Sequence, residues 1–408
     1  MRVIIIGGGI GGLTTAIALS RALPDSTKID VYERVPVLLP IGAAISVWSN
    51  GVKVLKHLGL GDAIEAAAGD MQRMAYKTKD GKDLCDFSLQ PLYEKVGQRA
   101  CPIARTHLQR ILLEGATQSC TNVTVHLDKA AASFTQSATS VTITFSDGAS
   151  ETAHLLIIAE GTHSKLRNTV IGRPVQRSYV GYVNYNGAVP ITPALSDSPT
   201  TWTQYVGDGK RVSMMPMGDG HKFYFFFDVS MPAGSVASHP DTYKNELAAY
   251  FAGWADPVQN LIKTLDPAKV ARVEIHDIEE LTTFVNGRVA LLGDAAHGTA
   301  PDLGQGGCQA MEDAWVLAQA LKNHPGDHSA AYAEYDKLRV ERTVQLVSRA
   351  RKRAEMIHGK DMAVTMAWYE ELARESGEGI MDGMSKTILG APAGLDSAVE
   401  PLKKEGLM

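Results

Sequence analysis

The segment that most constrains the fold lies at the start of the chain, where a short apolar run leads into a cluster of glycines. Residues 3–6 are all β-branched and are followed by glycine, which predicts a buried parallel strand. Gly7, Gly9 and Gly12 then follow with the spacing GxGxxG, and apolar residues at helical spacing come directly after them. Residues 28–33 predict the next strand. The chain is therefore predicted to open with a strand–helix–strand unit of a parallel, Rossmann-like sheet.

Each glycine of this unit has a structural role in binding a dinucleotide. Gly7 permits the tight turn, Gly9 lets the backbone approach a pyrophosphate, and Gly12 allows close helix–strand packing. The helix that follows offers free N–H groups and the positive end of its dipole to the phosphates. Glu33 ends the next strand, where its carboxylate can accept hydrogen bonds from ribose hydroxyls. Because the motif follows a strand and opens a helix, a glycine-rich turn without a ligand is the less favoured interpretation.

A second glycine-rich signal lies far along the chain. Residues 288–292 predict another apolar strand, which leads directly into Gly293 and Asp294. A carboxylate at the end of a strand suits a ribityl hydroxyl. The loop PDLGQGG (301–307) then opens a helix, so its free N–H groups can face an anion or a flavin carbonyl. The two signals together predict a site for a flavin dinucleotide.

These motifs, together with Glu160-Gly161 and with Arg105 in the stretch ARTHLQ, resemble the class A flavoprotein monooxygenases, the para-hydroxybenzoate hydroxylase-like family. Glu160 stands where that family usually has aspartate. The resemblance implies a Rossmann-like FAD-binding domain, bound FAD, and NADH as cosubstrate. The cofactor-binding residues that it implies, together with the glycines of the first motif, are Gly7, Gly9, Gly11, Gly12, Glu33, Arg34, Ser46, Arg105, Asp294, Gly304, Gln305, Gly306, Gly307 and Cys308.

Longer stretches are similar to those members of the family that hydroxylate urate, among them GAAISVWSNGVK (42–53), GYVNYNG (181–187), VGDGKRVSMMP (206–216) and FYFFFDV (223–229). The similarity covers nearly the whole chain. It implies hydroxylation of urate at C5 to 5-hydroxyisourate with NADH and O2, through a flavin C4a-hydroperoxide, in purine catabolism. The substrate-binding residues that it implies are Asn184, Arg211 and Tyr224, with Arg211 and Tyr224 as the catalytic pair.

The chemistry of arginine supports this role for Arg211 independently of the resemblance. Urate is a planar monoanion near neutral pH, and the rigid donor fork of arginine suits such an edge. Arg211 lies in an alternating strand, 210–217, where its charge needs a partner, an open cleft or a path to water. Tyr224 in an aromatic core and Asn184 on a solvated strand edge are equally good interpretations without the family. Because Arg211 belongs to none of the flavin motifs, its replacement is expected to leave FAD binding unchanged.

The order of segments predicts an α/β fold with interleaved domains. Four strand-like segments between residues 178 and 229, with GDG turns at 207–209 and 218–220, predict a mixed or antiparallel substrate sheet. The charged stretch 329–358 predicts a helical tail. The predicted division places residues 1–75, 99–175 and 281–325 in the FAD-binding domain, 76–98 in a substrate-domain insertion, 176–280 in the substrate-binding β-sheet domain, and 326–408 in a C-terminal helical region.

Composition disfavours several other classes of protein. The net charge of −5 argues against a nucleic-acid or anionic-membrane partner. The four cysteines form no CxxC pair and HExxH is absent, so neither a disulfide scaffold nor a metal site is expected. No apolar run approaches ~18 residues, so no membrane-spanning segment is expected. The N-terminus has no signal-peptide pattern, which favours a cytoplasmic enzyme. A monomer or a homodimer is expected. His297 and Cys308 are expected to be packed side chains and not reactive groups.

Three alternatives stay open on the sequence. The first is a hydroxylase of another small aromatic acid, of the hydroxybenzoate, salicylate or hydroxynicotinate type. The second is an FAD-dependent dehydrogenase or reductase that does not activate oxygen. The third, a flavin-binding module without turnover, is disfavoured because Arg211 and the loop 301–307 would then lack a role. NADH oxidation and oxygen uptake stimulated by one substrate distinguish all of them.

Overall fold

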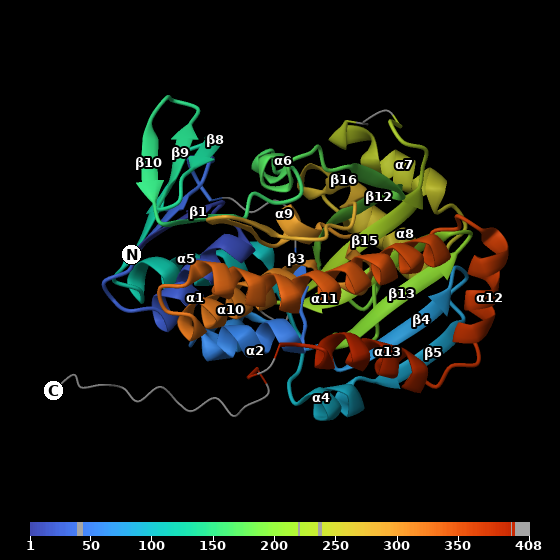
Figure 1. The fold of residues 1–408 in the computed structure, drawn as a ribbon. Coiled ribbons are helices and arrows are strands. Elements are labelled where there is room, and N and C mark those ends of the chain that lie inside the picture. Colours follow the sequence, from blue (N-terminus) through green and yellow to red (C-terminus); the bar gives the residue numbers. More distant parts are fainter. Residues whose placement is uncertain (39–43, 219–220, 236–238, 393, 396–408) are drawn as a thin grey trace.

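The computed structural model describes residues 1–38, 44–218, 221–235, 239–392 and 394–395. Two large β-sheets lie side by side, and a three-stranded sheet stands beside the N-terminus (Figure 1). The long helix α11 (His328–Ile357) runs across both parts, and α12 (Met362–Leu372) and α13 (Glu378–Leu389) follow it. The predicted α/β class, with a Rossmann-like sheet, a second mixed sheet and a helical C-terminal region, is confirmed.

The first sheet has six strands in the order β17-β18-β11-β1-β2-β7. Its middle strand β1 (Arg2–Ile6) pairs in parallel with β11 (Leu155–Ile158) and with β2 (Lys28–Tyr32). Residues 3–6 are at most 3% exposed, as expected for a parallel strand covered on both faces. The remaining strands are β7 (Val123–His126), β18 (Val289–Leu291) and the antiparallel edge strand β17 (Val285–Asn286).

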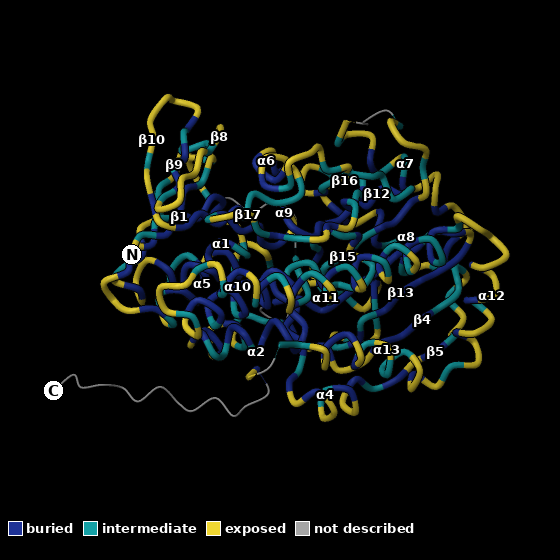
Figure 2. Tube along the Cα trace, in the orientation of Figure 1, coloured by how far each residue is buried: buried dark blue, intermediate teal, exposed yellow. Residues whose placement is uncertain are grey.

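Helices pack on this sheet and bury its apolar faces. α1 (Ile10–Ala22) starts right after the glycine cluster and packs against α10 (Gly306–Asn323) and α5 (Arg105–Gln118). Figure 2 shows that the buried residues gather where these elements meet and that exposed residues lie on the outer turns. The other helices of this part are α2 (Ser49–His57), α3 (Gly61–Ala67), α6 (Leu166–Ile171) and α9 (Asp294–His297). The short helix α4 (Gln90–Val96) follows β5 of the second sheet and packs against α13.

The second sheet has seven strands in the order β16-β12-β15-β14-β13-β4-β5. The turn between its strands β13 and β14 has Asp208 and Gly209 in the left-handed region, with φ of 51° and 66°, so the predicted Asp-Gly hairpin is confirmed. The second predicted turn includes residues 219–220, which lie outside the described ranges. The strands are β4 (Arg73–Thr78), β5 (Asp83–Ser88), β12 (Arg177–Pro190), β13 (Thr201–Gly207), β14 (Lys210–Met217), β15 (Lys222–Ser230) and β16 (Ala271–Ile278).

The two faces of this sheet have different roles. Phe223, Phe225 and Phe227 of β15 are buried in an apolar core with residues of α7 (Tyr243–Tyr250) and α8 (Asp256–Thr264). Because side chains alternate along a strand, Tyr224, Phe226 and Asp228 point to the opposite face. That face is turned toward the first sheet, and it therefore supplies one wall of any site between the two sheets.

The remaining strands connect the two sheets or extend them. β3 (Ala44–Val47) and β6 (Cys101–Ala104) form a two-stranded ribbon. The three-stranded sheet consists of β8 (Ala131–Gln136), β9 (Val141–Phe145) and β10 (Ser150–Ala153). The predicted division after residue 75 falls inside β4, which belongs as a whole to the second sheet. The division into domain segments stays a prediction.

Candidate active site

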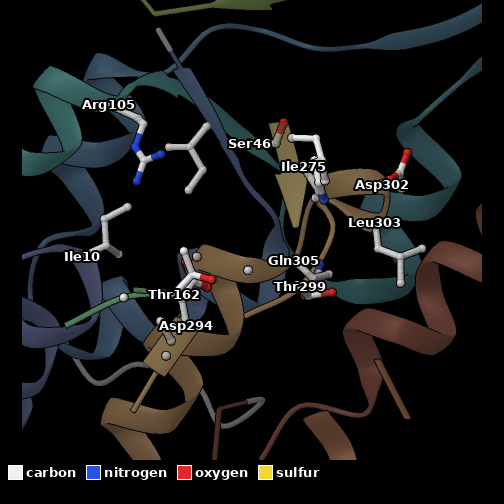
Figure 3. Close-up of a pocket in the computed structure, with 18 of the residues that line it drawn as sticks. Ile10, Ser46, Arg105, Thr162, Ile275, Asp294, Thr299, Asp302, Leu303 and Gln305 are labelled. Carbon is white, nitrogen blue, oxygen red and sulfur yellow. The ribbon is translucent and has the colours of Figure 1, made fainter. Parts of the chain in front are cut away.

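A cavity of about 1480 Å³ lies between the two sheets. It is larger than the ~300–1,000 Å³ of a usual small-molecule site, so it has room for a dinucleotide and a second ligand. Figure 3 shows how residues from distant parts of the chain face this space, with Arg105 and Ile10 on one side and Asp302 and Leu303 on another. Of the predicted site residues, all line the cavity except Gly12 and Cys308.

The first glycine motif forms a narrow turn whose atoms leave no space for side chains. Gly7 has φ of 108°, and a Cβ there would come within 2.3 Å of the Ala159 carbonyl oxygen. A Cβ on Gly12 would lie 1.9 Å from the Gly7 carbonyl oxygen, so only glycine lets α1 approach β1 this closely. Gly9 differs, because a Cβ there would meet nothing within 4 Å. Its open side faces the cavity, where a ligand can approach the backbone.

Glu33 follows β2 and stands beside this turn. One of its carboxylate oxygens accepts a hydrogen bond from the backbone N–H of Gly8 at 2.7 Å, and the other accepts from Val35 N–H at 3.1 Å. These two bonds hold the carboxylate at the edge of the cavity. Each oxygen retains a lone pair for a hydroxyl donor. The position predicted for a ribose acceptor is thus occupied by an oriented carboxylate.

Asp294 lies at the start of α9, after a turn at Gly293 with φ of 63°. Its side chain is exposed to the cavity (Figure 3), and among the described residues no hydrogen bond reaches its carboxylate. Arg167 holds the turn from behind, since its guanidinium is buried and donates to the carbonyl oxygens of Thr162 at 3.2 Å and Ala295 at 3.3 Å. Sequence reasoning missed Arg167, because no motif contains it.

The loop between α9 and α10 brings its backbone to the same space. Gly304 has φ of 63°, and a Cβ there would lie 2.7 Å from Nε1 of Trp48. Gly306 and Gly307 begin α10 without acidic residues in its first turn, so free N–H groups and the positive end of the helix dipole face the cavity.

Cys308 follows in the same helix but points away from the cavity. Its Sγ accepts a hydrogen bond from the Trp48 backbone N–H at 3.3 Å, and burial raises the pKa of the thiol to about 12. The thiol is therefore a packed, protonated group, as the sequence analysis expected.

Arg211 lies on the opposite wall, on β14, and is 7% exposed. Its Nε donates to an Asp228 oxygen at 2.8 Å, and its Nη2 lies 2.7 Å from the same oxygen and 3.0 Å from Oδ1 of Asp302. The guanidinium carbon lies 5.0 Å from the centre of the Phe226 ring. Among the described residues none bonds to Nη1, so this nitrogen is available to a ligand in the cavity.

These contacts link Arg211 to the flavin side of the cavity. Arg211 itself lies in none of the flavin motifs, but its partner Asp302 belongs to the loop 301–307 that leads into α10, so we now expect the replacement of Arg211 to affect FAD binding as well. Asp302, on the flavin side of the cavity, is thus one of the carboxylates that balance the charge of Arg211. Strand alternation indicated that Arg211 needed a partner, but no local pattern could identify one from a loop 91 residues further along the chain.

Asn184 and Tyr224 line the cavity on the same wall. Nδ2 of Asn184 donates to Asp228 at 2.7 Å, and Nδ2 of Asn186 donates to Oδ1 of Asn184 at 2.8 Å. The Tyr224 ring packs beside Phe226, and burial raises the pKa of its hydroxyl well above its usual value. No hydrogen bond to that hydroxyl occurs within the described part of the chain, so it can donate to a bound substrate.

Under the flavin loop lies a buried ionic network that the sequence analysis did not find. Arg339 of α11 is fully buried and donates to Asp313 at 2.6 Å and to Glu312 at 2.7 Å. Nε2 of His297 contacts Asp313 at 2.6 Å, and the Gly293 N–H donates to the same carboxylate at 2.9 Å. His297 is therefore a packed histidine that supports the turn before Asp294, as expected.

The described residues fit FAD. The turn at Gly9 offers open space to a pyrophosphate, and α10 directs N–H groups into the cavity. Glu33 offers an oriented acceptor, and Asp294 offers a carboxylate that no described residue occupies. No group of three or more metal-ligating side chains occurs within the described ranges, and none of the helices there is long and apolar enough to cross a membrane.

Comparisons with known proteins agree with this geometry. A family model described as FAD binding domain matches residues 1–350. The FAD-dependent urate hydroxylase of Klebsiella pneumoniae is 50% identical over 395 residues, covering 97% of this chain and 100% of that protein. The solved structure of Klebsiella pneumoniae HpxO complexed with FAD and uric acid matches with a TM-score of 0.91 and 50% identity, over 97% of this chain and 98% of that chain.

A more distant relative shows the wider family. The 3-amino-4-hydroxybenzoate 2-monooxygenase of Streptomyces cremeus is 33% identical over 367 residues, covering 88% of this chain and 89% of that protein. Since a family model and full-length relatives agree, this chain belongs to the FAD binding domain family and, within it, to the FAD-dependent urate hydroxylases among the flavoprotein monooxygenases.

Proposed function

We propose that this protein hydroxylates urate at C5 to 5-hydroxyisourate, with FAD as cofactor and NADH and O2 as cosubstrates. The observation that carries the proposal is the position of Arg211. Arg211 lines a cavity that is shared with the flavin motifs and that Asn184, Asn186 and Tyr224 also line, and no described residue bonds to its Nη1. Relatives of 50% and 47% identity that carry the name urate hydroxylase support the same substrate.

The wall around Arg211 matches the shape and polarity of urate. Urate is planar, and its edges alternate carbonyl oxygens with ring nitrogens. Nη1 of Arg211 and the Tyr224 hydroxyl can donate to carbonyl oxygens or to the anionic edge. The hydrogen-bonded pair Asn184–Asn186 still offers an amide oxygen and amide N–H groups to the other polar atoms of the purine. Fixing the purine ring in one orientation brings C5 toward the flavin, which is the positioning contribution of the protein.

FAD, when bound and reduced by NADH, supplies the oxygen activation for the hydroxylation. Gly9, Glu33, Asp294 and the N-terminus of α10 are the groups that would hold it. The positive end of α10 would stabilise negative charge on the cofactor. Arg105, whose side chain reaches into the cavity in Figure 3, is a further cation, on the side of the cavity where Ile10 lies.

We further infer a cytoplasmic location and a monomeric or homodimeric state. All four cysteines are buried free thiols, which suits a reducing compartment. Gel filtration with light scattering measures the assembly state directly, and a trimer or larger assembly would contradict this inference.

Substrate-stimulated turnover tests the proposed function. Purified enzyme with FAD, NADH and air should consume NADH much faster with urate than with 4-hydroxybenzoate or salicylate. Stimulation by an aromatic acid and not by urate would favour the related hydroxylases instead. NADH oxidation with transfer of electrons to an acceptor other than oxygen would favour a dehydrogenase or reductase.

A further inference from the structure

Asp302 connects the flavin side of the cavity with the substrate side. It lies in the short turn Pro301–Leu303, and its side chain is completely buried against the protein while the residue borders the cavity (Figure 3). Its Oδ1 accepts hydrogen bonds from Nη2 of Arg211 and from Nε2 of His358, both at 3.0 Å. Its Oδ2 accepts one from the Tyr182 hydroxyl at 2.7 Å. Three donors therefore converge on one carboxylate.

This environment keeps Asp302 ionised. Burial on its own would raise the pKa of its carboxyl group, but the charges and hydrogen bonds of His358 and Arg211 lower it far below its usual range. An ionised carboxylate can only accept hydrogen bonds, so Nε2 of His358 must carry the proton and donate. His358 thus acts as a donor whichever protonation state its other nitrogen has.

His358 does not border the cavity, and Asp302 links it to Arg211. It caps the C-terminal end of α11, and its side chain is 5% exposed. The ring stacks on Tyr182 with 3.7 Å between the ring centres. Its backbone is held as well, because its N–H donates to Ala354 and its carbonyl oxygen accepts from Ser230.

The charges around Arg211 show why such a donor is needed. One guanidinium faces two buried carboxylates, Asp228 and Asp302, so the cluster has an excess of negative charge before the donors around it are counted. An anionic substrate at Nη1 would be repelled by that excess. A second donor on Oδ1 of Asp302 offsets part of the carboxylate charge and restrains the oxygen that Arg211 binds.

We propose that His358 is a positioning residue for Arg211: its bond to Asp302 orients the arginine toward the substrate. The inference rests on the proposed urate hydroxylation. It gives the end of α11 a role in coupling, that is, in the fraction of NADH oxidation that yields hydroxylated urate. A misplaced Arg211 would hold urate out of line while NADH oxidation continues. Loss of this donor should therefore direct more of the oxygen to hydrogen peroxide.

Two variants separate the hydrogen bond from the packing of the ring. His358→Phe keeps a ring on Tyr182 but has no donor, whereas His358→Gln loses the ring and keeps an N–H near the position of Nε2. We expect His358→Phe to lower kcat/KM for urate about 10-fold, in the range for a hydrogen bond to a charged group, and to lower the yield of hydroxylated urate per NADH. His358→Gln should recover most of both.

The controls make the outcomes distinguishable. His324 forms a histidine–carboxylate pair with Glu334 at 2.7 Å, partly exposed and away from the cavity, and His324→Phe should leave the coupling unchanged. FAD content and melting temperature are measured for every variant. If His358→Phe does not fold, His358→Asn replaces it, because the asparagine amide ends short of Asp302. Wild-type protein that fails to hydroxylate urate would refute the proposed function, and with it the inference that rests on that function.

If the wild type hydroxylates urate, the remaining outcomes decide the inference. Wild-type coupling in His358→Phe, or an equal loss in the phenylalanine and glutamine variants, would show that the ring only packs. A double-mutant cycle gives a second readout, because the loss from His358→Phe should shrink in an Asp302→Asn background, where no carboxylate remains to be held. Additive losses in the cycle would overturn the inference.

Discussion

At the scale of single residues, the site depends on one buried cation that two carboxylates keep charged. Burial on its own would lower the pKa of Arg211, but Asp228 and Asp302 raise it, so the guanidinium stays protonated. Removing one partner of a buried ion pair leaves an uncompensated charge, which costs roughly 3–5 kcal/mol. Arg211 is therefore both a substrate ligand and part of the folded structure, and variants have to be chosen with both roles in mind.

The first prediction compares two replacements of Arg211. Arg211→Lys keeps the charge but loses the planar donor fork, so it should fold, retain FAD, and lose about 10- to 100-fold in kcat/KM for urate, with more NADH diverted to peroxide. Arg211→Met leaves Asp228 and Asp302 without their cation and should also lower the melting temperature and FAD content. Steady-state kinetics with peroxide quantification measures the effect. Wild-type coupling in the lysine variant would show that Arg211 does not orient urate.

At the scale of elements, two glycines at the junction between β1 and α1 differ in why they exclude a side chain. Gly12 contacts the backbone of Gly7, whereas Gly9 borders open space in the cavity. The GxGxxG spacing predicted both roles from the sequence, because the turn, the close packing and the phosphate approach each require glycine at one position. The structure adds the distances that separate a folding requirement from a binding requirement.

The second prediction follows from these distances. Gly9→Ala should fold with an unchanged melting temperature in the apo form, since its Cβ meets no atom, but should bind FAD more weakly because the methyl group occupies the approach to the backbone. Gly12→Ala should destabilise the apo form as well, because its Cβ would overlap the Gly7 carbonyl. Thermal denaturation of apoprotein and FAD titration measure the two effects. Equal apo stabilities for both variants would contradict the assignment.

The third prediction concerns the ionic network that joins α10 to α11. Arg339 is fully buried between Glu312 and Asp313, so Arg339→Met should cost roughly 3–5 kcal/mol of unfolding free energy. The pair Arg374–Glu370 on α12 is largely exposed, and Arg374→Met should change stability by less than about 0.5 kcal/mol. Denaturant titration of both variants gives the comparison, and similar small changes in both would show that the buried network contributes little.

The fourth prediction is the acid sensitivity of the same network. Burial on its own would raise the pKa of Asp313, but His297 and Arg339 lower it from 3.8 to about 2. Since the folded pKa lies below the unfolded one, the stabilisation is complete above about pH 4 and is lost as the pH falls toward 2. A shift of this size is worth about 2 kcal/mol. The unfolding free energy of Asp313→Asn should therefore fall less steeply than that of the wild type between these pH values. Parallel plots of unfolding free energy against pH would contradict a role for Asp313 in acid sensitivity.

At the scale of the whole molecule, the sequence was most informative where function depends on local backbone. The glycine turns, the strand before Asp294, the Asp-Gly hairpin and the long C-terminal helix all follow from short-range patterns. The network Asp228–Arg211–Asp302–His358 could not be predicted, because its members come from β15, β14, a loop and the end of α11. Pairings across such separations are decided by tertiary packing, for which a single sequence carries no signal.

The measurement that tests the account most directly is the stoichiometry of urate hydroxylation. Enzyme loaded with FAD is mixed with urate and NADH in air, and the loss of urate's ultraviolet absorbance is followed together with NADH and oxygen. We expect one NADH and one O2 to disappear per urate, with little hydrogen peroxide. NADH oxidation that urate does not accelerate, or urate that remains unconsumed while NADH and oxygen disappear, would contradict it.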